Sequence, residues 1–187
     1  MIQLPLLLLL LASDASATSP RQGWASKDGV VALRPHGERL QVDDAAGRES
    51  IRDAFARWGI AYDEGQVDVI RSLFTPDATF RVLRGSKEPI ASADGIDAIL
   101  LNVTSALAQQ NDQRRHAISN IVIDRMTATD ATAIAYGIVT IARDGLSLGA
   151  TVIYSADLKR GRDGVWRFSR FAIGMDDYAG RTIVNPK

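Results

Sequence analysis

The sequence predicts an α+β domain in which a curved, mixed or antiparallel β-sheet wraps around three N-terminal helices. In the first half of the chain, apolar residues recur at spacings of three and four, the period of amphipathic helices. In the second half, β-branched or alternating runs are separated by Asp, Gly and Arg, which is typical of an antiparallel meander. The length of 187 residues, of which 46% are hydrophobic, allows one compact domain and an added segment.

The helices are expected in the first 110 positions of the sequence. The first begins at the capping pair Ser50 and Asp53 and ends near Gly65. A second, short helix covers 67–74 and stops before a proline, and Asp94 is expected to cap the third. The apolar stripes of the first and third helices are Ile51, Phe55, Trp58 and Tyr62, and then Ile96, Ile99, Leu100, Val103 and Leu107.

The strands follow a different pattern, with alternating or continuous β-branched residues. A first strand is expected over 77–83, and the "GSKEP" sequence after it is expected to form a turn or loop. The four strands of the meander are expected at 117–123, 132–142, 148–158 and 165–173. The sequence contains no internal repeat, and we expect one domain rather than two.

The N-terminal segment 1–17 has the pattern of a signal peptide, with six consecutive leucines before an A-x-A cleavage site. The apolar run is too short to span a bilayer, so no stable membrane insertion is expected after processing. The signal pattern predicts export of the protein to the periplasm or out of the cell. No Lys or Arg precedes the leucines, which leaves open a cytoplasmic protein with a misassigned start. The segment 18–48 is expected to be a flexible arm with an exposed His36, and 178–187 a C-terminal tail.

Composition excludes several classes of site. Lys plus Arg and Asp plus Glu both number 22, so no net charge favours nucleic acid or an anionic membrane. The chain has no cysteine, which rules out disulfides, thiolate nucleophiles and cysteine-based zinc sites. It also lacks the H-E-x-x-H, G-x-S-x-G, Walker and G-x-G-x-x-G motifs. We therefore expect no metal and no cofactor, and either small-molecule chemistry or protein contact.

Asp63 and His116 are the candidate catalytic residues. Asp63 falls at the C-terminal end of the first helix, where the helix dipole disfavours an anion by about 0.3 to 1 kcal/mol. A carboxylate there could accept a hydrogen bond from an imidazole, fixing its tautomer and raising its basicity, as proton abstraction requires. The residues alone leave two structural alternatives open: Asp63 belongs to a polar turn, and His116, at the start of a strand, is merely hydrogen-bonded structure.

Three stretches of the sequence resemble the SnoaL-like branch of the nuclear transport factor 2-like superfamily. They are "RWGIAYDEGQVDVIRSLFTPDATF", "RRHAISNIVID" and "RDGVWRFSRF", and the resemblance extends over roughly 49–177. The resemblance implies a cone-shaped, cystatin-like roll, which agrees with the element order predicted above. It also implies that the chain forms a homodimer or a larger homo-oligomer, because the open sheets of this superfamily commonly pack against a second copy.

Within the superfamily, the pattern of Trp58, Tyr62 and Asp63 resembles the helix segment of scytalone dehydratase, and His116 resembles that enzyme's first catalytic histidine. The hexachlorocyclohexane dehydrochlorinase is similar in placing a base dyad at the equivalents of Asp63 and His116. The chain lacks the second histidine of scytalone dehydratase, so the resemblance does not extend to that enzyme's complete mechanism.

These observations predict a cofactor-independent lyase, dehydratase or isomerase that acts on a small hydrophobic or polycyclic compound. Asp63 would orient His116, and His116 would remove a proton next to a carbonyl or leaving group. Strand alternation predicts that His116 shares a face of its strand with Asn120 and Val122. By the same rule, Arg170 shares a face with Trp166, and Tyr136 with Ile134. The expected substrate-binding residues are Trp58, Tyr62, Phe80, Asn120, Tyr136, Tyr154 and Arg170. Two other functions remain open, namely non-catalytic binding of a small molecule and a dimerisation domain.

Overall fold

A computed structural model describes residues 23–35 and 44–176 of the chain. The predictions for 1–17, for His36 and for the tail 178–187 lie outside the described residues. The helices are α1 (Trp24–Lys27), α2 (Ala45–Asp63), α3 (Val67–Ser72) and α4 (Ile96–Ala108). The strands are β1 (Phe74–Arg84), β2 (Pro89–Asp94), β3 (Gln113–Met126), β4 (Asp130–Ala142), β5 (Leu146–Arg160) and β6 (Trp166–Met175).

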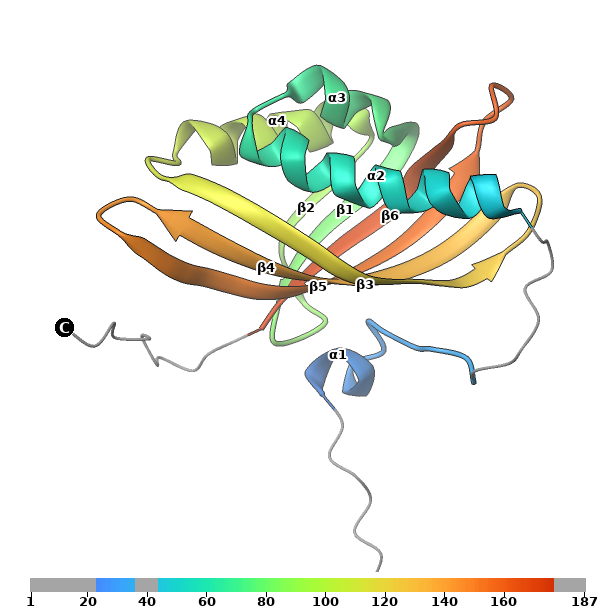
Figure 1. The fold of residues 1–187 in the computed structure, drawn as a ribbon, viewed down its shortest axis with the longest axis horizontal. Helices are drawn as coiled ribbons and strands as arrows, with labels where there is room; N and C mark the ends of the chain where they lie inside the picture. The colour runs from blue at the N-terminus through green and yellow to red at the C-terminus, as the bar shows by residue number, and fades with distance from the viewer. Residues whose placement is uncertain (1–22, 36–43, 177–187) are drawn as a thin grey trace, which may run out of the picture.

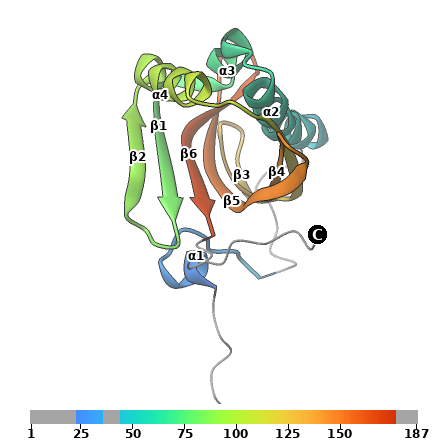
Figure 2. The ribbon, with the colours of Figure 1, turned by 90° about the vertical axis from the view of Figure 1, so that its left-hand side faces the viewer.

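The strands form one six-stranded sheet in the order β2-β1-β6-β5-β4-β3. β1 and β6 run parallel, and every other neighbouring pair is antiparallel. The sheet curves around α2, with α3 and α4 above the same face and α1 on the opposite face (Figures 1 and 2). This arrangement confirms the predicted α+β class with a curved, mixed sheet around the helices and a meander from β3 to β6.

α2 forms because its apolar residues line one side and a polar residue caps its start. The Asp44 side chain accepts a hydrogen bond from the Gly47 N–H at 2.7 Å, so the helix begins before the predicted Ser50. Gly65 follows the helix with a φ of 64°, a left-handed conformation that ends helices without steric cost. The buried residues of α2 include Ile51, Ala54, Phe55, Trp58 and Ala61.

The region around Asp94 differs from the prediction. β2 is a short edge strand that pairs with β1, and the sequence analysis did not identify it. Asp94 is the last residue of β2, where its carboxylate lies 2.7 Å from Arg81, and Gly95 is the N-cap of α4 with a φ of 84°. A positive φ is accessible to glycine at little cost, so the turn into α4 selects glycine rather than a capping side chain.

An aromatic cluster fills the space between α2 and the sheet. Phe168 and Phe171 of β6 have ring centroids 4.5 Å apart, and Phe55 of α2 packs edge-on to Phe168 at 5.2 Å. Trp58 contacts Phe171 with centroids 5.0 Å apart. These contacts hold α2 against the sheet, which determines where the C-terminal end of α2 lies.

The described part of the predicted arm, residues 23–35, packs on the outer face of the sheet. The Trp24 Nε1 donates to Asp176 at 2.7 Å, and Ala25 packs with Ile134 and Ile153. The Arg34 backbone N–H donates to the Asp124 carboxylate at 2.9 Å. Within 23–35 and 44–176, no helix is both long and apolar enough to cross a membrane.

Candidate active site

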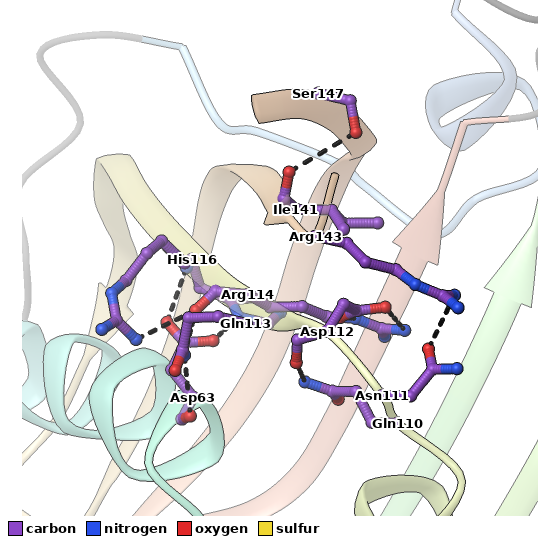
Figure 3. Close-up of polar contacts among 11 residues, drawn as sticks. Asp63, Gln110, Asn111, Asp112, Gln113, Arg114, His116, Ile141, Arg143 and Ser147 are labelled. Carbon is purple, nitrogen blue, oxygen red and sulfur yellow. Dashed lines mark hydrogen bonds and ion pairs between the residues drawn. The ribbon is translucent and has the colours of Figure 1, made fainter. Parts of the chain in front are cut away.

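Asp63 and His116 are hydrogen-bonded to each other through two contacts. The Nδ1 of His116 lies 2.5 Å from one carboxylate oxygen of Asp63, and the backbone N–H of His116 donates to the other at 2.7 Å (Figure 3). The two side chains are 5% and 12% exposed respectively. The fold thus brings the two side chains into contact, although they are 53 positions apart in the chain.

The contact depends on a close approach between α2 and β3. Gly59 faces β3, and a Cβ at this position would lie 3.3 Å from the Cβ and the carbonyl oxygen of His116. The absence of a side chain thus lets the helix lie directly against the strand. At the end of the helix, the Gln113 side chain donates to the Asp63 carbonyl oxygen at 3.3 Å and joins the two elements again.

The two contacts determine which imidazole nitrogen is available. An ionised Asp63 only accepts hydrogen bonds, so in the neutral imidazole of His116 the proton sits on Nδ1 and the free lone pair on Nε2. Among the described residues, no hydrogen bond occupies Nε2. The geometry therefore leaves one basic nitrogen free to take a proton.

The hydrogen bonds also explain how a carboxylate is accommodated at a helix C-terminus. The helix dipole disfavours an anion at this end by about 0.3 to 1 kcal/mol. Asp63 offsets this with two hydrogen bonds from His116, one of them from a backbone N–H that would otherwise lack a partner at the sheet edge. The structure thus excludes the alternative in which Asp63 is only a solvated turn residue.

A series of aromatic ring contacts leads away from the dyad through Tyr62, Trp58 and Phe80. The Tyr62 ring packs edge-on to the His116 imidazole with centroids 5.3 Å apart, and Trp58 packs against Tyr62 at 5.5 Å. Phe80 is buried and contacts Trp58 with centroids 6.0 Å apart. Burial raises the pKa of Tyr62, Arg114 opposes this shift, and the Asp63 charge adds to it, so the hydroxyl stays protonated at neutral pH.

Tyr154 comes from β5, on the opposite side of the interior from α2. Its side chain is buried, and its ring stacks on Phe171 with centroids 5.5 Å apart. Burial raises the pKa of Tyr154, and the negative charge of Asp63 raises it further. The raised pKa keeps the Tyr154 hydroxyl protonated at neutral pH, so it remains a hydrogen-bond donor in the interior.

Asn120 is a correction to the predicted site. The expectation that His116, Asn120 and Val122 share a face fails because β3 is bulged after Ser119, where Asn120 has a φ of 52°. The extra residue reverses the alternation, so Ile121 and Ile123 pack toward the core while Asn120 and Val122 are exposed.

Arg170 and Tyr136 are likewise not brought to the dyad. Arg170 lies on the outer face, where it donates to Asp157 at 2.6 Å, because β6 is bulged at Ser169 and Phe171 points inward instead. Tyr136 does share a face with Ile134, as predicted, but that face is the outer one, and Tyr136 is 53% exposed.

Two features near the dyad were missed in the sequence. Gly59 is a single glycine within an apolar helical pattern, a signal of close packing that could have been identified. Arg114, two residues before His116 on β3, forms an ion pair with Asp112 at 2.9 Å and lowers the pKa of the Tyr62 hydroxyl. Within the described ranges, no three His, Cys, Asp or Glu side chains are grouped as a metal ion would need.

Comparison with known proteins gives a consistent result. The model of the SnoaL-like domain family matches residues 43–172. No curated protein matches the sequence. Similar solved structures include a Nostoc punctiforme protein of unknown function with a cystatin-like fold, which has a TM-score of 0.64 and 19% identity over 73% of this chain and 96% of that one. This similarity confirms the cystatin-like roll.

Two further structures are similar over most of their length. A protein from Catenulispora acidiphila, solved in complex with S-DNPA, has a TM-score of 0.60 and 28% identity over 71% of this chain and 95% of its own. The beta subunit of a proposed aromatic-ring-hydroxylating dioxygenase from Novosphingobium aromaticivorans has a TM-score of 0.62 and 22% identity over 72% and 92% of the two chains.

Proposed function

We propose a function for this chain from one premise: it belongs to the SnoaL-like domain family. Members of such a fold family differ in activity, so the function has to be argued from the site. We propose that the protein is a cofactor-independent lyase, dehydratase or isomerase that removes a proton from a small hydrophobic or polycyclic compound. The single observation that carries this proposal is the double hydrogen bond between Asp63 and His116, which in the neutral imidazole places the proton on Nδ1 and the lone pair on Nε2.

In the proposed reaction, His116 takes a proton from a carbon next to a carbonyl or leaving group. Asp63 holds the ring and stabilises the imidazolium that forms, which is the role of a carboxylate paired with a histidine base. A base of this kind contributes about 10² to 10⁴ in rate. Tyr62 packs on the His116 ring, and Trp58 and Phe80 extend the apolar surface beyond Tyr62, which favours a hydrophobic compound.

The similarity to the Catenulispora acidiphila protein supports a small-molecule substrate. That protein was solved in complex with S-DNPA, and at 28% identity it is a closer match in sequence than the other two structures described above. We propose that this chain takes a compound of similar size on the helix-covered face of its sheet, beside the dyad.

Exchange of carbon-bound protons tests this proposal without knowledge of the natural product. 2-Tetralone, a bicyclic aromatic ketone with acidic protons next to its carbonyl, is incubated with the protein in D₂O and followed by proton NMR. We expect the protein to accelerate deuterium incorporation at that carbon, because His116 removes the proton and solvent returns a deuteron.

The same experiment separates catalysis from simple binding. If 2-tetralone and S-DNPA bind, as measured by calorimetry, but exchange proceeds at the rate without protein, then the base is inactive and the chain is a binding domain. An exchange rate that persists in the Asp63→Asn variant would also contradict the proposal, since it would assign the proton transfer to another group.

We also propose that two copies pair through the outer face of the sheet. Apolar side chains stay exposed on neighbouring strands there, with Tyr136 53%, Ile138 48% and Leu148 40% exposed. Monomeric proteins rarely expose such a continuous apolar patch, and a two-fold dimer would bury it against itself.

Sedimentation of the full chain at increasing concentration tests the dimer. Ile138→Glu should shift it to a monomer, because a charge would be buried without a partner. Ile60→Glu is the matched control, since Ile60 is 62% exposed but lies on α2. A wild-type chain that sediments as a monomer throughout would refute the dimer and leave the enzymatic proposal unaffected.

A further inference from the structure

The indole N–H of Trp58 is buried and has no acceptor. Trp58 is 1% exposed, and its Nε1 makes no hydrogen bond, although it lies in the interior beside the dyad. A buried donor without a partner costs free energy, and such groups in native structures call for an explanation. Trp58 lies one turn of α2 before Tyr62 and packs against it, and Tyr62 packs in turn on the His116 imidazole, so Trp58 is one ring contact removed from the dyad.

Tyr154 supplies a second donor next to Trp58. Both rings contact Phe171, with centroids 5.0 Å and 5.5 Å from it. The Trp58 N–H is directed at the Tyr154 oxygen and lowers the pKa of that hydroxyl, against the larger effect of burial, although the contact falls short of full hydrogen-bond geometry. This contact uses the Tyr154 oxygen as the acceptor, so among the described residues the Tyr154 O–H proton has no acceptor of its own.

The neighbouring strand is built to hold Tyr154 in this position. Gly137 of β4 lies under the Tyr154 ring, and a Cβ there would come within 2.8 Å of Cε2 and 3.2 Å of the hydroxyl oxygen. The ring can lie flat over β4 only because position 137 has no side chain. The hydroxyl is therefore positioned by packing and by the stacked Phe171 rather than by a hydrogen bond.

We propose that the Trp58 N–H and the Tyr154 O–H together bind the carbonyl oxygen of the substrate. This inference rests on the proposed function and makes it more specific. A substrate that loses its proton next to a halide leaving group has no oxygen to satisfy two buried donors, whereas an enolisable ketone or ester does. The substrate class is therefore a hydrophobic carbonyl compound, with its oxygen at Trp58 and Tyr154 and its acidic carbon at His116.

The proton-transfer step balances within these groups. His116 Nε2 takes the proton, the electrons of the broken C–H bond form the carbon–carbon double bond of the enolate, and the carbonyl π electrons move to oxygen. The resulting negative charge accepts hydrogen bonds from Trp58 and Tyr154, which were placed before the reaction began. Transfer of the proton from His116 to a different carbon of a conjugated enolate re-forms the carbonyl and completes an isomerisation. Loss of a leaving group from the carbon next to the one that lost its proton completes an elimination, as the enolate electrons re-form the carbonyl.

Binding of an enolate mimic tests the donor pair without requiring catalysis. 4-Nitrophenol, at an alkaline pH where it is the phenolate, presents a negative oxygen on an apolar ring, and nitrobenzene is the matched probe without that oxygen. We expect the full chain to bind the phenolate more tightly. Trp58→Phe and Tyr154→Phe should each lower that affinity about ten-fold and leave the affinity for nitrobenzene unchanged.

The outcomes separate the possible roles of Trp58. Equal phenolate affinity in the wild type and both variants would overturn the proposal and indicate that a buried water satisfies the N–H. If Trp58→Phe lowered the affinity for 4-nitrophenolate and for nitrobenzene by the same factor, the proposal would also be overturned, because Trp58 would then only provide apolar surface. Tyr154→Phe removes a single oxygen from a buried ring, so it keeps the test valid if Trp58→Phe fails to fold.

The proposed function and the donor pair can fail separately. If the protein accelerates deuterium exchange of 2-tetralone but does not bind 4-nitrophenolate more tightly than nitrobenzene, the proposed base of Asp63 and His116 is retained and the donor pair is refuted. If the wild type prefers 4-nitrophenolate through Trp58 and Tyr154 but does not accelerate exchange, the donor pair is retained and the proposed base is refuted.

Discussion

Asp63→Asn and His116→Ala should each lower the rate of 2-tetralone exchange by at least about 100-fold while the protein stays folded. His116→Ala removes the nitrogen that takes the proton. Asp63→Asn changes the tautomer of His116. The amide oxygen of the asparagine can still accept from the His116 backbone N–H, which fixes the orientation of the amide. The amide NH₂ then faces Nδ1 and donates to it, which moves the ring proton to Nε2 and leaves no base.

The neighbouring residue provides a matched control. Glu64 follows Asp63 in the chain and forms an ion pair with Arg115 at 2.8 Å, with its side chain 46% exposed. Glu64→Gln removes one carboxylate from the same helix end and should leave exchange unchanged. Full exchange activity in both Asp63→Asn and His116→Ala would contradict the dyad.

Tyr154 reports on the Asp63 charge independently of activity. Because the Asp63 carboxylate helps to raise the pKa of Tyr154, Asp63→Asn should lower that pKa toward its ordinary value, with burial still holding it above. An absorbance titration of the tyrosines at alkaline pH would detect the shift. An unchanged titration would mean that the charge does not reach the interior region assigned to the substrate.

Local periodicity was enough to predict the first helix and the meander. The apolar residues of α2 recur at helical spacing, and the meander strands alternate over stretches long enough to be identified from sequence. β2 was missed because it is short and lies at an edge, where little burial shapes its sequence. The start of α2 was misplaced because Asp44 competes with Ser50 as a cap, and only the Gly47 contact distinguishes them.

The candidate site was harder to predict, because it depends on which face each residue occupies. One bulged residue reverses the alternation of a strand, and this occurs at Asn120 in β3 and at Ser169 in β6. Tyr136 shows a different limit. Strand alternation correctly placed it on the same face as Ile134, but which face the helices cover depends on how the whole sheet curves around them. Asp63 and His116 were identified through family resemblance, because no local pattern relates positions 53 apart.

Gly59→Leu should reduce 2-tetralone exchange by about 100-fold by a different route, the separation of α2 from β3. A Cβ at this position already comes within 3.3 Å of the His116 Cβ and of Ile118 Cδ1, so a leucine side chain has no space between helix and strand. Overpacking of this kind costs about 1 to 3 kcal/mol of stability, which thermal unfolding would measure. The Asp63 to His116 hydrogen bond lies one turn further along the helix, and it lengthens when the helix moves away.

Gly59→Ala separates the contribution of distance from that of stability. Alanine gains up to about 1 kcal/mol in helix propensity over glycine, which offsets part of the cost of its contact with His116. We therefore expect an unfolding temperature near that of the wild type and an exchange rate between those of the wild type and Gly59→Leu. Ala56→Leu, on the exposed side of α2, adds the same bulk without facing β3 and should leave exchange unchanged. If Gly59→Leu kept wild-type exchange, the close approach of α2 to β3 would not be what holds the carboxylate on the imidazole.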